Sequence, residues 1–163
     1  MKEHTLSVRA IRNGTVIDHI PVGGAMAILH HFALTKVKNY VTVGFNLPSS
    51  KGGLKDLIKL EEVFFTEERI KEIAFFAPHA TINIIKDFKV IKKSEPTYPD
   101  HIAGIFSCPN SNCASHGEPV ESFFTVHSGA KNPLLQWHYC EKIFPFLVVY
   151  TCLLYTSLMA RGR

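Results

Sequence analysis

Three cysteines constrain the second half of the chain more than any other feature. Cys108 and Cys113 lie in "CPNSNCASHGEPV", residues 108–120, and Cys140 closes "WHYC", residues 137–140. A C-x4-C pair between turn-forming residues is typical of one half of a tetrahedral zinc site, whose other half is a second cysteine pair. Trp137 stands where the first cysteine of a C-x2-C pair would be. The pattern therefore predicts a metal site in which one ligand has been substituted.

The rest of the chain has the composition of a globular protein. Its 163 residues are 46% hydrophobic, which fits one ordinary domain or two small ones. The net charge of +4 favours phosphates, nucleic acid or an acidic partner without selecting among them. The first 14 residues contain no apolar core of signal-peptide length, so we expect a cytoplasmic protein. In a reducing compartment the cysteines are better explained as metal ligands or buried thiols than as disulfides.

Hydrophobic periodicity predicts an α+β unit over residues 1–95. The expected elements are a strand at 5–11, a helix at 24–34, strands at 40–48 and 57–65, a helix capped by Thr66 and ended by Pro78, and a strand at 80–91. Their order, β-α-β-β-α-β, is that of the ferredoxin-like arrangement. Such a sheet packs its helices on one face and leaves the other face for another use.

A charged, proline-containing stretch at 92–100 separates this unit from a small β-rich unit at 101–150. The second unit is too small to be robust on its own core, so we expect a metal to stabilise it. Residues 143–160 carry no charged side chain, and a membrane span is the alternative there. Pro145 and several polar residues favour a buried strand instead. We interpret residues 151–163 as an atypical tail that is foreign to the native reading frame.

Four motifs together resemble one known family. They are "GTVIDHIP" at 14–21, "DLIKLE" at 56–61, "APHATIN" at 77–83 and the cysteine-bearing stretch at 108–120. In this order and spacing they resemble the regulatory chain of aspartate carbamoyltransferase, over about residues 5–142. The resemblance implies an allosteric domain of ferredoxin-like fold followed by a zinc-binding domain that contacts the catalytic chain.

The resemblance also implies a non-catalytic function in pyrimidine biosynthesis. Chains of this family pair as homodimers that bridge trimers of the catalytic chain, and they bind nucleoside triphosphates far from the active sites. CTP, assisted in some members by UTP, favours the low-activity state, and ATP favours the active one. Two effectors of one pocket act oppositely only if each contacts the two quaternary states differently. No nucleic acid and no membrane are expected as partners.

The matching motifs carry a set of effector-binding residues to this sequence. The set comprises Ala10, Ile11, Val16, Asp18, His19, Lys59, Asn83, Val90 and Lys93. Apolar members would clamp a base, Asp18 would accept hydrogen bonds from ribose hydroxyls, and the cationic members would neutralise phosphates. Arg9 and Glu95 depart from the family pattern near this pocket. Glu95 would weaken the attraction for a triphosphate by like-charge repulsion.

The zinc ligands depart from the family pattern more strongly. The family binds zinc with four cysteines, of which Cys108, Cys113 and Cys140 are present and the third is replaced by Trp137. His138 is the nearest substitute, although it is offset by one residue. Other candidates are His116 and Cys152. A site with three ligands would bind zinc more weakly and leave one position open, so we expect a structural Zn²⁺ site that is impaired.

Two other classes of function compete with regulation. A zinc-ribbon nucleic-acid binder would use the basic charge and aromatic residues such as Phe123, Phe124 and Tyr139 for stacking. Its cations, however, are spread through the chain and do not line the cysteine-bearing unit. An enzyme is the third class, but no nucleophile–base pair, carboxylate pair or substrate loop stands out, and we expect no catalytic residues.

Overall fold

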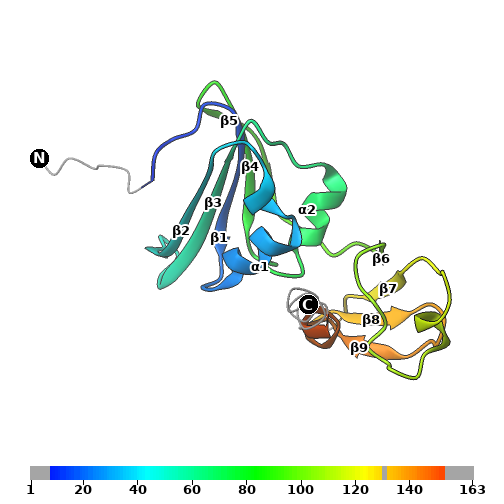
Figure 1. Ribbon diagram of the computed structural model, residues 1–163. Coiled ribbons are helices and arrows are strands. Elements are labelled where there is room, and N and C mark those ends of the chain that lie inside the picture. The colour runs from blue at the N-terminus through cyan, green and yellow to red at the C-terminus, as the bar shows by residue number, and fades with distance from the viewer. Residues whose placement is uncertain (1–7, 130–131, 153–163) are drawn as a thin grey trace, which may run out of the picture. The chain divides into compact units, whose positions relative to one another are not determined.

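The computed structural model describes residues 8–129 and 132–152. The chain divides into two compact units, Met1–Thr97 and Tyr98–Arg163. Each unit contains its own antiparallel sheet (Figure 1).

The first unit is a five-stranded sheet with two helices. Its elements are β1 (Gly14–Ile20), α1 (Gly24–His31), the 3₁₀ turn η1 (Leu34–Lys36), β2 (Val41–Pro48), β3 (Leu54–Glu61), α2 (Glu67–Ile73), β4 (Thr81–Lys86) and β5 (Lys89–Ser94). The strand order is β2-β3-β1-β4-β5, and every neighbouring pair is antiparallel. The order of the first four strands is that of the ferredoxin-like fold, with β5 added at the edge. The predicted α+β class and element order are confirmed.

The first strand lies later in the chain than the sequence predicted. Residues 8–11 form no strand, and β1 runs instead from Gly14 to Ile20. Residues 5–11 alternate apolar and polar side chains, whereas Gly14–Ile20 alternates less well, because it has two adjacent apolar residues and two adjacent polar ones. The second stretch forms the strand because it pairs on both sides, with β3 and with β4, and buries Thr15 and Ile17 completely. The predicted strand at 5–11 is therefore wrong over its described residues.

The predicted strand at 80–91 is two strands joined by a tight turn. Asp87 and Phe88 both have positive φ, 48° and 63°, and they connect β4 to β5. Two consecutive residues of this conformation form the hairpin turn whose twist matches that of the strands. The turn lacks the Asn-Gly or Asp-Gly pair that would have identified it in the sequence.

The two helices cover one face of the sheet and form the core with it (Figure 1). Helix α1 buries Ala25, Ile28 and Leu29, as its spacing predicts. Helix α2 begins at the cap that the sequence predicts, because the Thr66 Oγ accepts a hydrogen bond from the Arg69 N–H at 3.4 Å. The fully buried residues facing the helices from the sheet include Ile17, Ile20, Ile58, Leu60 and Ile82.

Gly14 at the start of β1 cannot be replaced without steric conflict. Its φ is +137°, and a Cβ there would lie 1.9 Å from the carbonyl oxygen of Leu60. We expect Gly14→Ala to lower the free energy of unfolding by about 3 kcal/mol, because neither backbone can move without breaking the β1–β3 ladder. Chemical denaturation would measure the loss.

Gly53→Ala is the matched control for this prediction. Gly53 also has a positive φ, +74°, but a Cβ there would meet no atom within 4 Å. The control carries only the conformational cost, about 1 kcal/mol. Equal losses in the two variants would contradict the steric argument.

The second unit is a four-stranded sheet with the order β6-β7-β8-β9. The strands are β6 (His101–Ala103), β7 (Phe123–His127), β8 (Leu134–Trp137) and β9 (Ile143–Pro145), and a 3₁₀ turn, η2 (Ala114–His116), follows Cys113. Aromatic and aliphatic side chains fill its core. The buried members include Phe106, Phe124, Leu135, Trp137, Phe146 and Val149.

The apolar segment after residue 142 is mostly helical where the structure describes it. Only residues 143–145 form a strand, and residues 146–152 are helical, so the predicted buried strand is wrong beyond Pro145. The helical part buries Phe146, Val149 and Tyr150, which is a helical spacing that the continuous apolar run concealed. Within residues 8–129 and 132–152, no helix has both the length and the apolar composition to cross a membrane. Most of the predicted tail lies outside the described residues.

Candidate effector cavity and cysteine cluster

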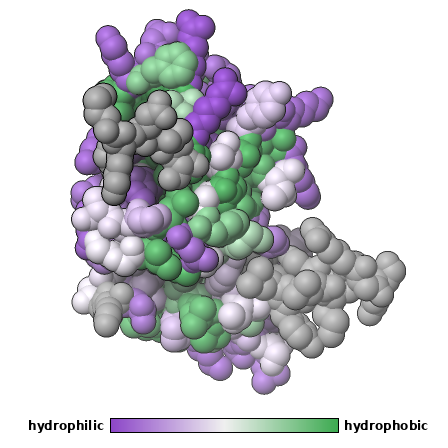
Figure 2. All heavy atoms as spheres, turned by 90° about the vertical axis from the view of Figure 1, so that its left-hand side faces the viewer, coloured by the Kyte–Doolittle hydropathy of each residue, from purple (hydrophilic) through white to green (hydrophobic). Residues whose placement is uncertain are grey.

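The sheet face opposite the helices contains a cavity of about 470 Å³, which we call the sheet-face cavity. Its lining residues are Val8, Ala10, Ile11, Val16, Asp18, Leu47, Pro48, Lys55, Leu57, Lys59, Asn83, Ile85, Phe88 and Val90. Figure 2 views this side, where apolar residues in green run across the surface between hydrophilic residues in purple. The volume lies within the usual range for small-molecule sites, about 300–1,000 Å³.

Strand alternation brings these residues together from distant parts of the sequence. Lys55, Leu57 and Lys59 are two residues apart on β3 and share the cavity face, whereas Ile58 and Leu60 between and beyond them face the helices. The same alternation places residues of β1 and β4 beside them. The resulting site is apolar over most of its wall and polar at a few positions.

A bulge in β1 separates Asp18 from His19. Ile17 pairs with Ile58 and Ile20 with Asp56, so β1 has one more residue than β3 over this interval. His19 takes the extra position with a φ of 56°. As a result, Asp18 lines the sheet-face cavity, and His19 lines a separate cavity of about 250 Å³ together with residues such as Lys51 and His79.

Asp18 and Lys55 form an ion pair inside the cavity. The Lys55 Nζ lies 2.8 Å from the Asp18 Oδ1, and the two side chains are 18% and 23% exposed. Burial raises the pKa of Asp18, but hydrogen bonds from Lys55 and from the His19 N–H, with the charges of both residues, outweigh it and lower the pKa overall. Asp18 is therefore ionised at neutral pH.

Lys59 binds the chain segment that closes one side of the cavity. Its Nζ donates hydrogen bonds to the carbonyl oxygens of Val8, at 3.2 Å, and Arg9, at 2.7 Å. Burial lowers the pKa of Lys59, and the charge of Asp18 opposes that shift. Since Asp18 is already paired with Lys55, the charged groups lining the cavity carry one net positive charge.

A fully buried carboxylate, Asp56, supports the cavity wall through hydrogen bonds to the backbone. Its Oδ1 accepts a hydrogen bond from the Asn46 N–H at 3.1 Å. Its Oδ2 accepts from the N–H groups of Gly23 at 2.9 Å and Ala25 at 3.5 Å. The first bond fixes the irregular part of β2 just before Leu47, which lines the cavity, and the others cap α1, whose own N-cap residue Gly23 has no side chain to do so.

The structure brings together most of the predicted effector residues. Ala10, Ile11, Val16, Asp18, Lys59, Asn83 and Val90 line the sheet-face cavity. Lys93 does not line it, although it pairs with Asn83 across the β4–β5 ladder and is exposed. The side chains of Arg9 and Glu95 are not among the lining groups either.

Sequence reasoning missed several lining residues. They are Val8, Leu47, Pro48, Lys55, Leu57, Ile85 and Phe88. Strand alternation from Lys59 back to Lys55 was the available signal for the β3 members. Phe88 had no such signal, because its place depends on the unrecognised hairpin turn.

Three thiols of the second unit form a cluster. The Sγ atoms of Cys108, Cys113 and Cys140 all lie within 4.8 Å of one another. The Cys108 and Cys140 sulfurs are 3.7 Å apart, which is too long for a disulfide bond of about 2.05 Å. Two thiolates on one tetrahedral zinc, with Zn–S bonds of about 2.3 Å, would be about 3.8 Å apart. The cluster therefore fits three positions of a metal centre.

Thiols this close need a cation if they are all to ionise. Burial, together with hydrogen bonding to neighbouring cysteines, raises the pKa of Cys108 to about 12. Hydrogen bonds from the side chain and backbone of Ser115, whose Oγ lies 3.1 Å from the Cys113 Sγ, lower the pKa of Cys113 to about 7. A bound divalent ion would stabilise all three thiolates, which is the chemistry expected of this donor set.

The other predicted ligands lie differently. His138 is exposed, and its ring packs against Phe123 and Tyr139 at centroid distances of 5.7 and 5.1 Å. The His116 Nε2 is 2.9 Å from the carbonyl oxygen of Asn110. Cys152 is exposed on the helical segment. Among the described residues, the metal-type cluster contains only the three cysteines.

Comparison with known families covers both units. Residues 6–97 match the model for the allosteric domain of the aspartate carbamoyltransferase regulatory chain. Residues 100–149 match the model for the metal-binding domain of the same chain. The protein belongs to the aspartate carbamoyltransferase regulatory chain family. The resemblance seen in the sequence motifs is thereby confirmed.

Relatives of this regulatory chain are similar over most of their length. The regulatory chain of Chromobacterium violaceum is 53% identical over 142 residues, which is 87% of this chain and 93% of the relative. The regulatory chains of Aeromonas hydrophila, at 49% over 143 residues, and Klebsiella pneumoniae, at 47% over 147 residues, cover 88% and 90% of this chain and 93% and 96% of their own. This is therefore a regulatory, non-catalytic chain with an allosteric and a metal-binding domain, related to an enzyme of pyrimidine biosynthesis.

Proposed function

We propose that this regulatory chain controls aspartate carbamoyltransferase by binding nucleoside triphosphates in the sheet-face cavity. CTP would favour the low-activity state, with UTP assisting, and ATP would favour the active state. The apolar lining residues, such as Val16 and Val90, would hold the base. Asp18 would accept hydrogen bonds from the ribose, and Lys59 would bind phosphate. We assign this function to residues 1–95 as the allosteric domain. His19 and Lys93, which neighbour the lining residues Asp18 and Asn83, would also bind phosphate.

One observation supports this proposal above the others. Lys59 is half-buried at the cavity wall, and it donates to two backbone carbonyls, not to a carboxylate. Carbonyl oxygens bind an ammonium group more weakly than ionised oxygens do. A phosphate entering the cavity could therefore replace them as the partner of Lys59, whereas Lys55 would first have to leave Asp18.

The second unit would supply the connection to the enzyme. We propose that residues 101–150 form a zinc-binding domain, with Zn²⁺ on Cys108, Cys113 and Cys140, and that this domain contacts the catalytic chain. Two regulatory chains would pair and bridge catalytic trimers in the cytoplasm. The matched metal-binding domain and the three clustered thiols support this assignment. We also propose that residues 151–163 are a tail that does not belong to the native reading frame.

Lys59→Met is expected to weaken binding of both CTP and ATP about 10- to 100-fold. The reason is the loss of one charge-assisted hydrogen bond, about 1.5–3 kcal/mol, at about 1.4 kcal/mol for each factor of ten. Titration calorimetry on the full chain would measure the affinities. In the assembled enzyme, the same variant should shift the aspartate saturation curve less on addition of either nucleotide.

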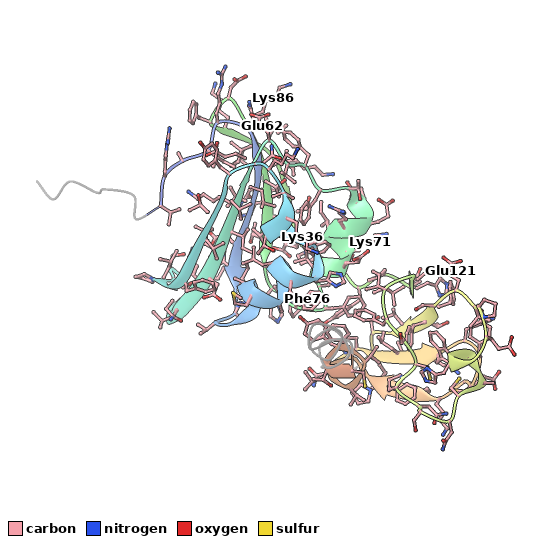
Figure 3. The ribbon with its side chains drawn as sticks, viewed as in Figure 1. Lys36, Glu62, Lys71, Phe76, Lys86 and Glu121 are labelled. Carbon is pink, nitrogen blue, oxygen red and sulfur yellow. The ribbon has the colours of Figure 1, made fainter. Side chains whose placement is uncertain are left out.

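Lys86→Met is the control, because Lys86 is exposed at the end of β4 and lies outside the cavity (Figure 3). It removes the same charge from the same unit and should leave both affinities unchanged. Equal weakening in the two variants would indicate a general charge effect and contradict the assigned site. Salt-sensitive binding of a random oligonucleotide, with no response to CTP, would instead favour a nucleic-acid-binding function.

A further inference from the structure

The cysteine cluster supplies three of the four ligands that a tetrahedral metal ion takes in a closed structural site. Over residues 8–129 and 132–152, no His, Asp or Glu side chain joins the three thiols. Cys108 and Cys113 are buried, but Cys140 is half-buried, so the cluster is most accessible on the Cys140 side.

The turn that would carry the fourth ligand is present, but its side chain cannot coordinate. The Trp137 N–H donates to the Lys142 carbonyl oxygen, and its own carbonyl oxygen accepts from the Glu141 N–H, both at 3.0 Å. Glu141 has the positive φ, 58°, that closes such a turn after Cys140. The indole N–H of Trp137 is only a hydrogen-bond donor and has no lone pair for a metal.

The indole is also held away from solvent by its own packing. Trp137 is 3% exposed, and its ring lies against Phe124 and Tyr139 at centroid distances of 4.7 and 5.6 Å. Its Nε1 is buried and has no hydrogen-bond partner among the described residues. The substitution thus changed the side chain into part of the core while the backbone kept Cys140 beside the other two thiols.

The nearby polar groups are engaged elsewhere. The His116 ring nitrogen pairs with the Asn110 carbonyl, and the His138 ring packs on half-buried Phe123 and exposed Tyr139. The Ser115 hydroxyl is beside Cys113, but a hydroxyl is not among the usual zinc ligands, which are thiolate, imidazole and carboxylate. Nothing described in the second unit therefore completes the site.

We propose that the metal centre of this chain keeps one coordination position for a small exogenous ligand. The inference rests on the proposed zinc site. Three thiolates on a divalent ion carry one net negative charge. A fourth thiolate can still bind when the chain itself holds it in place, but a free anion would meet the repulsion without being held. The position therefore suits a neutral nitrogen donor of the imidazole class, in competition with water.

Cobalt(II) substitution of the full, untagged chain would test this, because its absorption bands report the ligands. We expect one equivalent of Co²⁺ per chain and a spectrum that shifts when imidazole is added. Trp137→Phe keeps the aromatic packing, removes the orphaned N–H and adds no ligand, so it should behave like the parent chain. Trp137→Cys should show thiolate-to-cobalt absorption higher by about one third, as the thiolates increase from three to four, and no response to imidazole.

Three results would overturn the inference. A parent spectrum that does not respond to imidazole, with one bound equivalent, would show a closed site and leave the proposed metal function intact. Appearance of an imidazole response only in His138→Ala would identify His138 as the fourth ligand. Failure of the parent chain to bind Co²⁺ would refute both the open position and the proposed zinc site. The comparison of the parent with Trp137→Phe stands even if Trp137→Cys does not fold.

Discussion

Cys108→Ser is expected to abolish metal binding and to unfold the second unit. It leaves two thiolates at a site that already has only three, and hydroxyl is a poor replacement. Metal binding supplies folding free energy in small metal-binding domains, and this unit has only short strands around a small core. We expect the zinc content to fall from about one equivalent to near zero and amide protection to disappear from β6 to β9.

The control for this prediction is Cys152→Ser, which changes an exposed cysteine outside the cluster. It should retain the zinc and the protection of the second sheet. Hydrogen exchange would also show whether β1 to β5 stay protected in Cys108→Ser, as expected for a separately folded unit. Full zinc content in Cys108→Ser would rule out the three-cysteine site.

Asp56→Ala is expected to lower the free energy of unfolding of the first unit by about 4 kcal/mol. The carboxylate is fully buried and accepts hydrogen bonds from the backbone of Gly23, Ala25 and Asn46. Ala25 is buried, and an orphaned donor there costs about 1–3 kcal/mol, whereas Gly23 and Asn46 are exposed residues whose bonds to the buried acceptor contribute about 1 kcal/mol each. Urea denaturation of the full chain would measure the loss.

Asp87→Ala is the matched comparison, because Asp87 forms an exposed ion pair with Arg12 at 3.3 Å. Such a pair contributes at most about 1 kcal/mol, so its loss should be small. Asp56→Asn keeps one acceptor oxygen and should fall between the two. A destabilisation by Asp56→Ala no larger than that of Asp87→Ala would disprove the bridging role. CTP affinity should fall as well, since Asp56 fixes the part of β2 that carries Leu47.

The sequence predicted the helices better than the strands. Thr66 begins α2 through local chemistry, a side-chain cap that needs no distant partner. The predicted end at Pro78 is wrong, because the helix already ends at Ile73. The first strand was misplaced because residues 5–11 alternate apolar and polar residues better than Gly14–Ile20, which has two adjacent apolar residues and two adjacent polar ones. Only pairing on both sides, which involves residues at least 36 positions away in the sequence, selects Gly14–Ile20 as the strand.

The candidate sites also contain some residues that local sequence identifies and others that only the fold brings to the site. Local spacing identified Cys108 and Cys113, and the motif around "DLIKLE" identified Lys59. Lys55, Phe88 and the role of Asp56 were missed. Their functions depend on a bulge, a hairpin and a buried carboxylate, each of which is set by contacts between separate strands.

The amino-acid sequence by itself determined the family, the two-unit order and the loss of one cysteine ligand, because these are properties of residue identity and spacing. Only the tertiary structure decided that Asp18 is neutralised by Lys55 while Lys59 is bound to carbonyl oxygens, and that Trp137 belongs to the core. Electrostatic pairing and burial depend on distances across the fold, and strand register and side-chain packing set those distances.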